Sequence, residues 1–125
     1  MEIFISSNVP SSKNSRVWTG RFSVESKRVT KYRKETRGQF QDSKELFLSM
    51  IKDKEKPYLI GFHFVRGNKH KWDFCNMLQI VQDVMVAEEW LFDDNCDEML
   101  PVPYKKDGVY YSVDKLGCGT YITIL

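Results

Sequence analysis

Alternating and periodic apolar positions along the chain predict a small set of strands and helices. Residues 58–66 (YLIGFHFVR) are rich in aromatic and β-branched residues, which is typical of a buried central strand. Within it, His63 is expected to be a hydrogen-bonded sheet residue rather than a catalytic group. Weaker strand patterns bounded by turn-forming residues occupy residues 2–6, 97–104, 109–113 and 120–125. Residues 17–23 fit either a short strand or a hairpin edge with a turn at Gly20.

Two further segments repeat apolar residues at helical spacing. In residues 39–52 these are Phe40, Phe47, Met50 and Ile51. In residues 74–89 they are Met77, Ile80, Val81, Val84 and Ala87, and Asp73 stands where an N-cap belongs. The order of elements predicts one α+β domain over residues 1–125, with two main helices packed on a mixed sheet.

Composition restricts the class of protein. The 125 residues are 42% hydrophobic and 29% charged, which is typical of a globular domain. No apolar run reaches the roughly 20 residues of a bilayer span, and the first residues lack the pattern of a signal peptide. The three cysteines form no CxxC pair and have no histidines at zinc spacing. We therefore expect a cytoplasmic protein with no membrane partner and no organic cofactor.

Charge is distributed unevenly. Residues 73–101 contain no Lys or Arg and carry eight acids, Asp73, Asp83, Glu88, Glu89, Asp93, Asp94, Asp97 and Glu98. If the chain folds back after the helix, three or four of these carboxylates would converge. Such carboxylates repel one another unless a cation lies between them, and an all-oxygen cluster suits Mg²⁺, with Mn²⁺ as a substitute. The alternative is that these acids are ordinary surface and capping residues.

The rest of the chain is basic. Residues 27–37 are rich in Lys and Arg and contain Tyr32, a composition that fits either a solvated helix face or a nucleic-acid backbone contact. Lys13, Asn14 and Arg16 lie in a polar loop, and Lys69 and Lys71 directly precede the acidic segment. A basic body with an acidic, metal-binding site is what an enzyme acting on a polyanion needs.

Four segments, taken together and in this order, resemble the RusA-like Holliday-junction resolvases, particularly those of phages and prophages. They are residues 10–16 (PSSKNSR), 71–76 (KWDFCN), 82–85 (QDVM) and 90–95 (WLFDDN). The resemblance covers about residues 1–104. It implies a RusA-like fold and a homodimeric, Mg²⁺-dependent endonuclease that resolves four-way DNA junctions by paired nicks in a bacterial host cell.

The resemblance also implies roles for particular residues. Asp73 matches the first acid of the family pattern, Asn76 its asparagine, Asp83 its helical aspartate, and Asp93 and Asp94 its closing pair. Asp73 and Asp94 would hold the metal, with Asp83 and Asp93 as further ligands or supporting groups and Asn76 orienting a ligand or phosphate. The DNA-binding residues would be Lys13, Asn14, Arg16, Lys69 and Lys71.

Two positions depart from the family pattern. Cys75 replaces the second acid, and a neutral thiol is a poor Mg²⁺ ligand. Gln79 replaces a lysine one turn after the asparagine. These departures favour an alternative function, a protein that binds branched DNA without cutting it. A structural or inhibitory protein with an acidic face is the third possibility.

Overall fold

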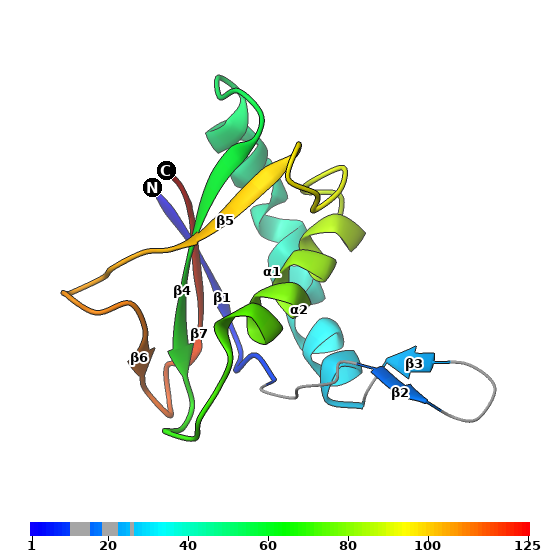
Figure 1. The fold of residues 1–125 in the computed structure, drawn as a ribbon, viewed down its shortest axis with the longest axis vertical. Helices are drawn as coiled ribbons and strands as arrows, with labels where there is room; N and C mark the ends of the chain where they lie inside the picture. Colours follow the sequence, from blue (N-terminus) through cyan, green and yellow to red (C-terminus); the bar gives the residue numbers. More distant parts are fainter. Residues whose placement is uncertain (11–15, 19–22, 26) are drawn as a thin grey trace.

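Strand β4 (Tyr58–Arg66) lies at the centre of a mixed five-stranded sheet in the computed structural model (Figure 1). One of its edges pairs antiparallel with β7 (Gly119–Ile124), which in turn pairs antiparallel with β1 (Glu2–Ser6). Its other edge pairs in parallel first with β5 (Met99–Pro103) and then with β6 (Ser112–Val113). The predicted central strand is confirmed with the same bounds. The structure describes residues 1–10, 16–18, 23–25 and 27–125, and the side chains of residues 1–10 and 27–125.

Two helices, α1 (Lys27–Ile51) and α2 (Phe74–Ala87), lie on one side of the sheet (Figure 1). The described chain is thus a single small α+β domain, as predicted. None of the helices in the described part of the chain is long and apolar enough to cross a membrane.

Helix α1 is longer than the predicted helix over residues 39–52, since it begins at Lys27. The basic segment contributes Val29, Tyr32 and Thr36, which are buried at three- and four-residue steps and continue the stripe to Phe40. Because these buried residues are widely spaced among cations, the sequence pattern did not predict that the helix begins before Gly38. Helix α2 was predicted over residues 74–89 and ends two residues earlier.

The core lies between the helices and the sheet, and Trp90 is its largest fully buried side chain. The ring stacks on Phe47 at a centroid distance of 4.7 Å and meets the edge of Phe40 at 5.1 Å. Its indole N–H donates a hydrogen bond of 2.9 Å to the carbonyl oxygen of Phe40. Trp90 therefore fixes the segment that follows α2 against the middle of α1.

The outer face of the sheet is partly covered by the connection from β5 to β6. The two ring nitrogens of buried His63 each lie 3.2 Å from a partner, the carbonyl oxygen of Tyr104 and the hydroxyl of Ser112. The prediction that His63 is a hydrogen-bonded sheet residue is confirmed. In the same connection, Asp107 and Gly108 have positive φ values of 53° and 83° and form a tight turn.

The remaining strands differ from the predictions mainly in length. Residues 17–23, predicted as a short strand or a hairpin edge, overlap two short antiparallel strands, β2 (Arg16–Trp18) and β3 (Ser23–Glu25), which agrees with the hairpin alternative. The turn predicted at Gly20 lies outside the described residues. The strand predicted over residues 97–104 is β5, and the one predicted over residues 120–125 is β7. The strand predicted over residues 109–113 shortens to β6, because Val109 belongs to the tight turn.

Helix α2 ends in a turn that directs the chain back along the helix. The amide of Trp90 donates to the carbonyl oxygen of Met85 and that of Glu89 to Val86, which is the Schellman arrangement. Glu89 has a φ of 62°, a left-handed conformation that is costly for any residue with a Cβ atom. Its side chain is exposed and forms an ion pair with Lys44 at 3.4 Å.

Replacing Glu89 with Gly is expected to raise the free energy of unfolding by about 0.5–1 kcal/mol, because glycine adopts this conformation without steric strain. Urea denaturation of both proteins measures the difference. Glu89→Ala is the control, since it removes the same exposed ion pair but keeps the Cβ atom, and it should change stability by less than about 0.5 kcal/mol. A glycine variant less stable than the alanine variant would contradict the strain argument.

Candidate functional site

Asp73 is the N-cap of α2, as predicted. Its backbone is extended, with φ −121° and ψ 117°, and its Oδ1 accepts hydrogen bonds from the amides of Cys75 at 2.9 Å and Asn76 at 3.3 Å. The side chain is exposed. One carboxylate oxygen of Asp73 is therefore engaged in starting the helix, at the point where the basic loop passes into the acidic segment.

Gln79 lies between two of the predicted carboxylates. Its side-chain Nε2 donates to Asp83 Oδ1 at 2.8 Å and to Asp94 Oδ2 at 3.2 Å. Asp83 is one helical turn further along α2, whereas Asp94 comes from the loop that returns after Trp90. The fold thus brings Asp83 and Asp94 to the same amide, and the two N–H groups of that amide take the place expected for a cation.

Asp93 has a different environment from its neighbour Asp94. Its Oδ1 accepts the backbone N–H of Asp94 at 2.8 Å, and its Oδ2 accepts the side-chain amide of Asn95 at 2.9 Å. These bonds, the backbone one first, lower the pKa of Asp93 below its ordinary value. Both oxygens of Asp93 therefore hold the loop itself in shape.

The four predicted metal ligands do not form one cluster. Asp73 and Asp83 are ten residues apart on α2, which is about 15 Å along a helix axis, so one ion cannot bind both. In the described residues, no group of three or more His, Cys, Asp or Glu side chains is placed to hold a metal ion. The convergence of three or four carboxylates is thus reduced to the pair Asp83 and Asp94.

This pair still fits the chemistry of magnesium. Mg²⁺ is commonly held by one or two carboxylates, with water and substrate phosphate as its remaining ligands. Asp83 is exposed and Asp94 half-buried, so both carboxylates can be reached from solvent. Cys75, Gln79 and Asp83 follow one another at four-residue steps, and the exposed face of α2 therefore carries a thiol, an amide and a carboxylate in line.

The predicted DNA-binding residues are placed only in part. Lys69 and Lys71 are exposed in the loop between β4 and α2. Lys13 and Asn14 lie outside the described residues, and Arg16 begins β2 with a side chain that is not described. Two cations of the basic segment 27–37, whose composition also fits a nucleic-acid contact, lie at the start of α1 beside the N-terminal loop; they are Arg28 and Lys31.

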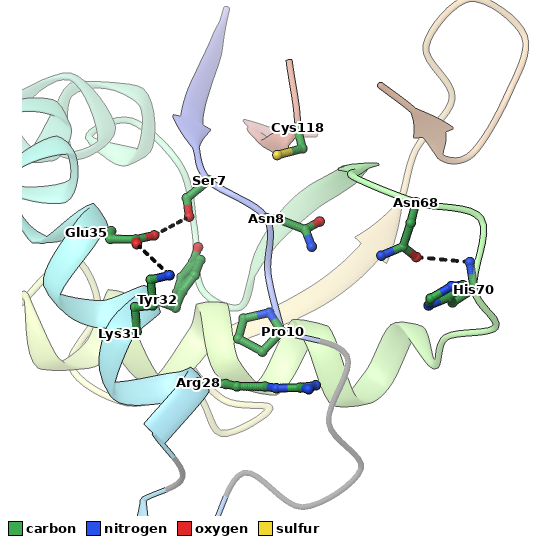
Figure 2. Close-up of a pocket in the computed structure, with 10 residues that line it drawn as sticks. All are labelled: Ser7, Asn8, Pro10, Arg28, Lys31, Tyr32, Glu35, Asn68, His70 and Cys118. Carbon is green, nitrogen blue, oxygen red and sulfur yellow. Dashed lines mark hydrogen bonds and ion pairs between the residues drawn. The ribbon is translucent and has the colours of Figure 1, made fainter. Parts of the chain in front are cut away.

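A pocket of about 610 Å³ lies between the N-terminal loop, the start of α1 and the loop after β4 (Figure 2). Among the described residues, its wall contains the cations Arg28 and Lys31 and one carboxylate, Glu35, which accepts a hydrogen bond from Ser7 and pairs with Lys31. The other lining residues are Asn8, Pro10, Tyr32, Asn68, His70 and Cys118. Burial raises the pKa of Tyr32, so its hydroxyl stays protonated. This end of the sheet is therefore polar and cationic.

Arg66, the last residue of β4, is a functional candidate that the sequence reasoning missed. Its side chain is only 1% exposed, and it follows Phe62 and Phe64 on the face of the strand that packs toward α2. The available signal was an arginine at a position where the two-residue alternation requires a buried side chain. A charged side chain is rarely fully buried in a protein unless it is paired, so the burial of Arg66 indicates a specific role.

Comparison with known proteins does not identify a family for this chain. The sequence matches no protein-family model, and no curated protein is significantly similar to it.

The depressed pKa of Asp93 makes a prediction about stability and pH. Because the folded-state pKa lies below the unfolded value, near 3.8, the stabilisation is present above that value and is lost as the pH falls through the folded pKa. Asp93→Asn should therefore be less stable than the wild type at neutral pH, and the difference should shrink in acid. Urea denaturation at a series of pH values measures it.

Asp97→Asn is the control for this experiment, because Asp97 is an exposed acid of the same loop. It should change the pH dependence much less. If the loss of stability in Asp93→Asn were the same at all pH values, the ionised carboxylate would not be its cause.

Proposed function

We propose that this protein is a metal-dependent endonuclease that cuts branched DNA, with the four-way junction as its substrate. The observation that carries the proposal is the meeting of Asp83 and Asp94 at Gln79, on a helix whose N-terminus follows a basic loop. A carboxylate pair beside a cationic surface is the combination that phosphodiester hydrolysis needs. The resemblance to the RusA-like resolvases supports the same reaction and substrate.

The residues of the acidic segment would have different roles in this reaction. Asp83 and Asp94 would hold Mg²⁺, which when bound supplies a Lewis acid for the phosphate oxygen and a water of lowered pKa. Gln79 separates the two carboxylates in the absence of a cation, and its amide has to turn away for both to bind one ion. Asp73 and Asp93 support the site indirectly, by starting α2 and by shaping the loop that carries Asp94.

The cations would bind the DNA backbone. Lys69 and Lys71 are exposed directly before α2, and Arg28 and Lys31 line a pocket to which Asn68 and His70 of the same loop also contribute. Each phosphate neutralised by such a side chain releases counterions, so affinity should fall steeply with salt. Paired incision of a two-fold symmetric junction requires two such sites, which is the reason to propose a C₂ homodimer.

The test is cleavage of a labelled synthetic four-way junction and of a matched linear duplex, with Mg²⁺, with Mn²⁺ and with EDTA. We expect paired nicks in the junction alone, abolished by EDTA. Asp94→Asn and Asp83→Asn should each lower the rate on the order of 10²-fold or more, because each removes half of the carboxylate pair. Asp73→Asn should lower it less, through weakening of the helix N-terminus.

Asp97→Asn is the matched control here too, since it removes an acid of the same loop that is not part of the pair. Equal loss of activity in Asp97→Asn and Asp94→Asn would show that general acidity of the segment matters, and not the pair. Cleavage that survives EDTA would contradict the metal-dependent reaction.

A second candidate function is binding of branched DNA without cleavage. The specific observation in its favour is that Gln79, a neutral side chain, already bridges Asp83 and Asp94, while Cys75 offers no carboxylate one turn earlier. Tight, salt-dependent binding of the junction with no nicking in either metal would establish this function in place of the first.

Replacing Cys75 with Asp distinguishes the two functions further. The new carboxylate would lie one turn before Gln79, as Asp83 lies one turn after it, and would add a hard ligand to the pair. We expect Mg²⁺-dependent cleavage to rise by about tenfold or more. Cys96→Asp adds the same charge at another exposed cysteine and is the control. An unchanged rate in Cys75→Asp would show that the position is dispensable.

A further inference from the structure

Arg66 is a buried cation without a counter-charge in the part of the chain that the structure describes. Its Nη1 donates to the carbonyl oxygen of His70, and its guanidinium carbon lies 5.2 Å from the centre of the Trp72 ring. Its Nε has no hydrogen-bond partner among the described residues. Within the described residues, no carboxylate forms an ion pair with it. A carbonyl group and an aromatic face satisfy the guanidinium only in part, because the fork has five N–H donors.

The surroundings of Arg66 increase this imbalance. The loop that covers it, residues 67–72, carries two more cations, Lys69 and Lys71. This loop contains no acidic residue. Burial also lowers the pKa of Arg66. Buried charges in proteins are almost always paired, since an unpaired buried charge loses its hydration without compensation. An anion from outside the chain would remove that cost.

A pocket of about 280 Å³ opens beside Arg66. Its lining combines the two cations Arg66 and Lys69 with aromatic side chains and an amide. The described lining residues are Arg66, Asn68, Lys69, His70, Trp72, Tyr111 and Val113. No acid is among them. The Trp72 and Tyr111 rings meet edge to face at 5.0 Å. Asn68 and His70 also line the larger pocket of Figure 2, so the two hollows adjoin.

We propose that this pocket is an oxyanion site for the phosphate group of a nucleotide or nucleic acid. An arginine fork and a lysine supply several donors for a tetrahedral oxyanion, and aromatic walls suit the sugar and base that accompany a nucleotide phosphate. The site is separate from the Asp83–Asp94 pair and does not depend on cleavage. The site shares Lys69 with the proposed DNA-binding surface, but its test does not require cleavage, so its failure and the failure of the proposed endonuclease activity are distinguishable.

The alternative is that Arg66 is a purely structural side chain that fastens the loop of residues 67–72 through His70 and Trp72. The two readings differ in what happens when phosphate is added. A structural arginine gives the same spectrum with and without phosphate, whereas a ligand-binding arginine changes the environment of its unpartnered Nε.

The experiment is an NMR titration of the ¹⁵N-labelled protein, at constant ionic strength kept with sodium chloride. The readouts are the Nε–Hε signal of Arg66 and the backbone amides of residues 66–72 and 111–113. The probes are inorganic phosphate, a deoxynucleoside monophosphate, and a short single-stranded oligonucleotide without terminal phosphate. We expect saturable shifts of the Arg66 signal, with the nucleotide binding more tightly than inorganic phosphate because the rings add contacts.

The probes also distinguish the two sources of phosphate. A site for free nucleotides saturates with the monophosphate and not with the oligonucleotide. A site for the nucleic-acid backbone saturates with the oligonucleotide. Both outcomes support the oxyanion site, and an Arg66 signal unmoved by all three probes overturns it.

Variants test whether the pocket itself is responsible. Lys69→Met and Tyr111→Ala change exposed side chains of the lining and should leave the fold intact, while each weakens binding by about tenfold, the loss expected for one charged or stacking contact. Lys115→Met removes an exposed cation that does not line the pocket and is the control.

Arg66→Lys keeps the charge but loses the fork, and should weaken binding more than Lys69→Met. Shifts of equal size and affinity in Lys115→Met and Lys69→Met would show non-specific binding to surface cations, which also overturns the proposal. Because Asp94→Asn leaves this pocket unchanged, it should bind phosphate normally even where it has lost all cleavage.

Discussion

The burial of Trp90 is the interaction on which the arrangement of the acidic segment depends. Its ring fills the space between Phe40 and Phe47 of α1, and its N–H satisfies a carbonyl group of that helix. A tryptophan buries more apolar surface than any other side chain, and it rarely does so without a partner for its N–H. Once Trp90 is in place, the chain leaves α2 through a left-handed residue and turns back, and Asp94 reaches Gln79.

The two polar regions beside α2 carry excess charge of opposite sign. Along the helix, Asp83 and Asp94 share a neutral amide where a cation would separate them better. Before the helix, Arg66 is buried close to the exposed Lys69 and Lys71. No carboxylate of the described residues forms an ion pair with it. A folded protein tolerates such imbalances at places where a ligand completes them. The proposed metal and the proposed phosphate each complete one.

Much of the fold was predictable because its signals are local. The central strand was recognised from nine consecutive residues of aromatic and β-branched type, and the N-cap from Asp73 followed by an apolar stripe. The first half of α1 was missed because its three buried residues are separated by cations. The strand predicted over residues 109–113 was too long, because the turn at Asp107 and Gly108 uses Val109 in its own closing bridge.

The candidate site was predictable only as a set of residue types. The sequence by itself determined the α+β class, the apolar faces of the helices and the concentration of acids after a basic loop, because periodicity and composition act over a few residues. Only the tertiary structure decided that Asp94 and Asp83 meet at Gln79, and that Arg66 is buried without an ion-pair partner among the described residues. Those outcomes depend on where Trp90 and the loops bring residues that are distant in the chain, and no local pattern carries that information.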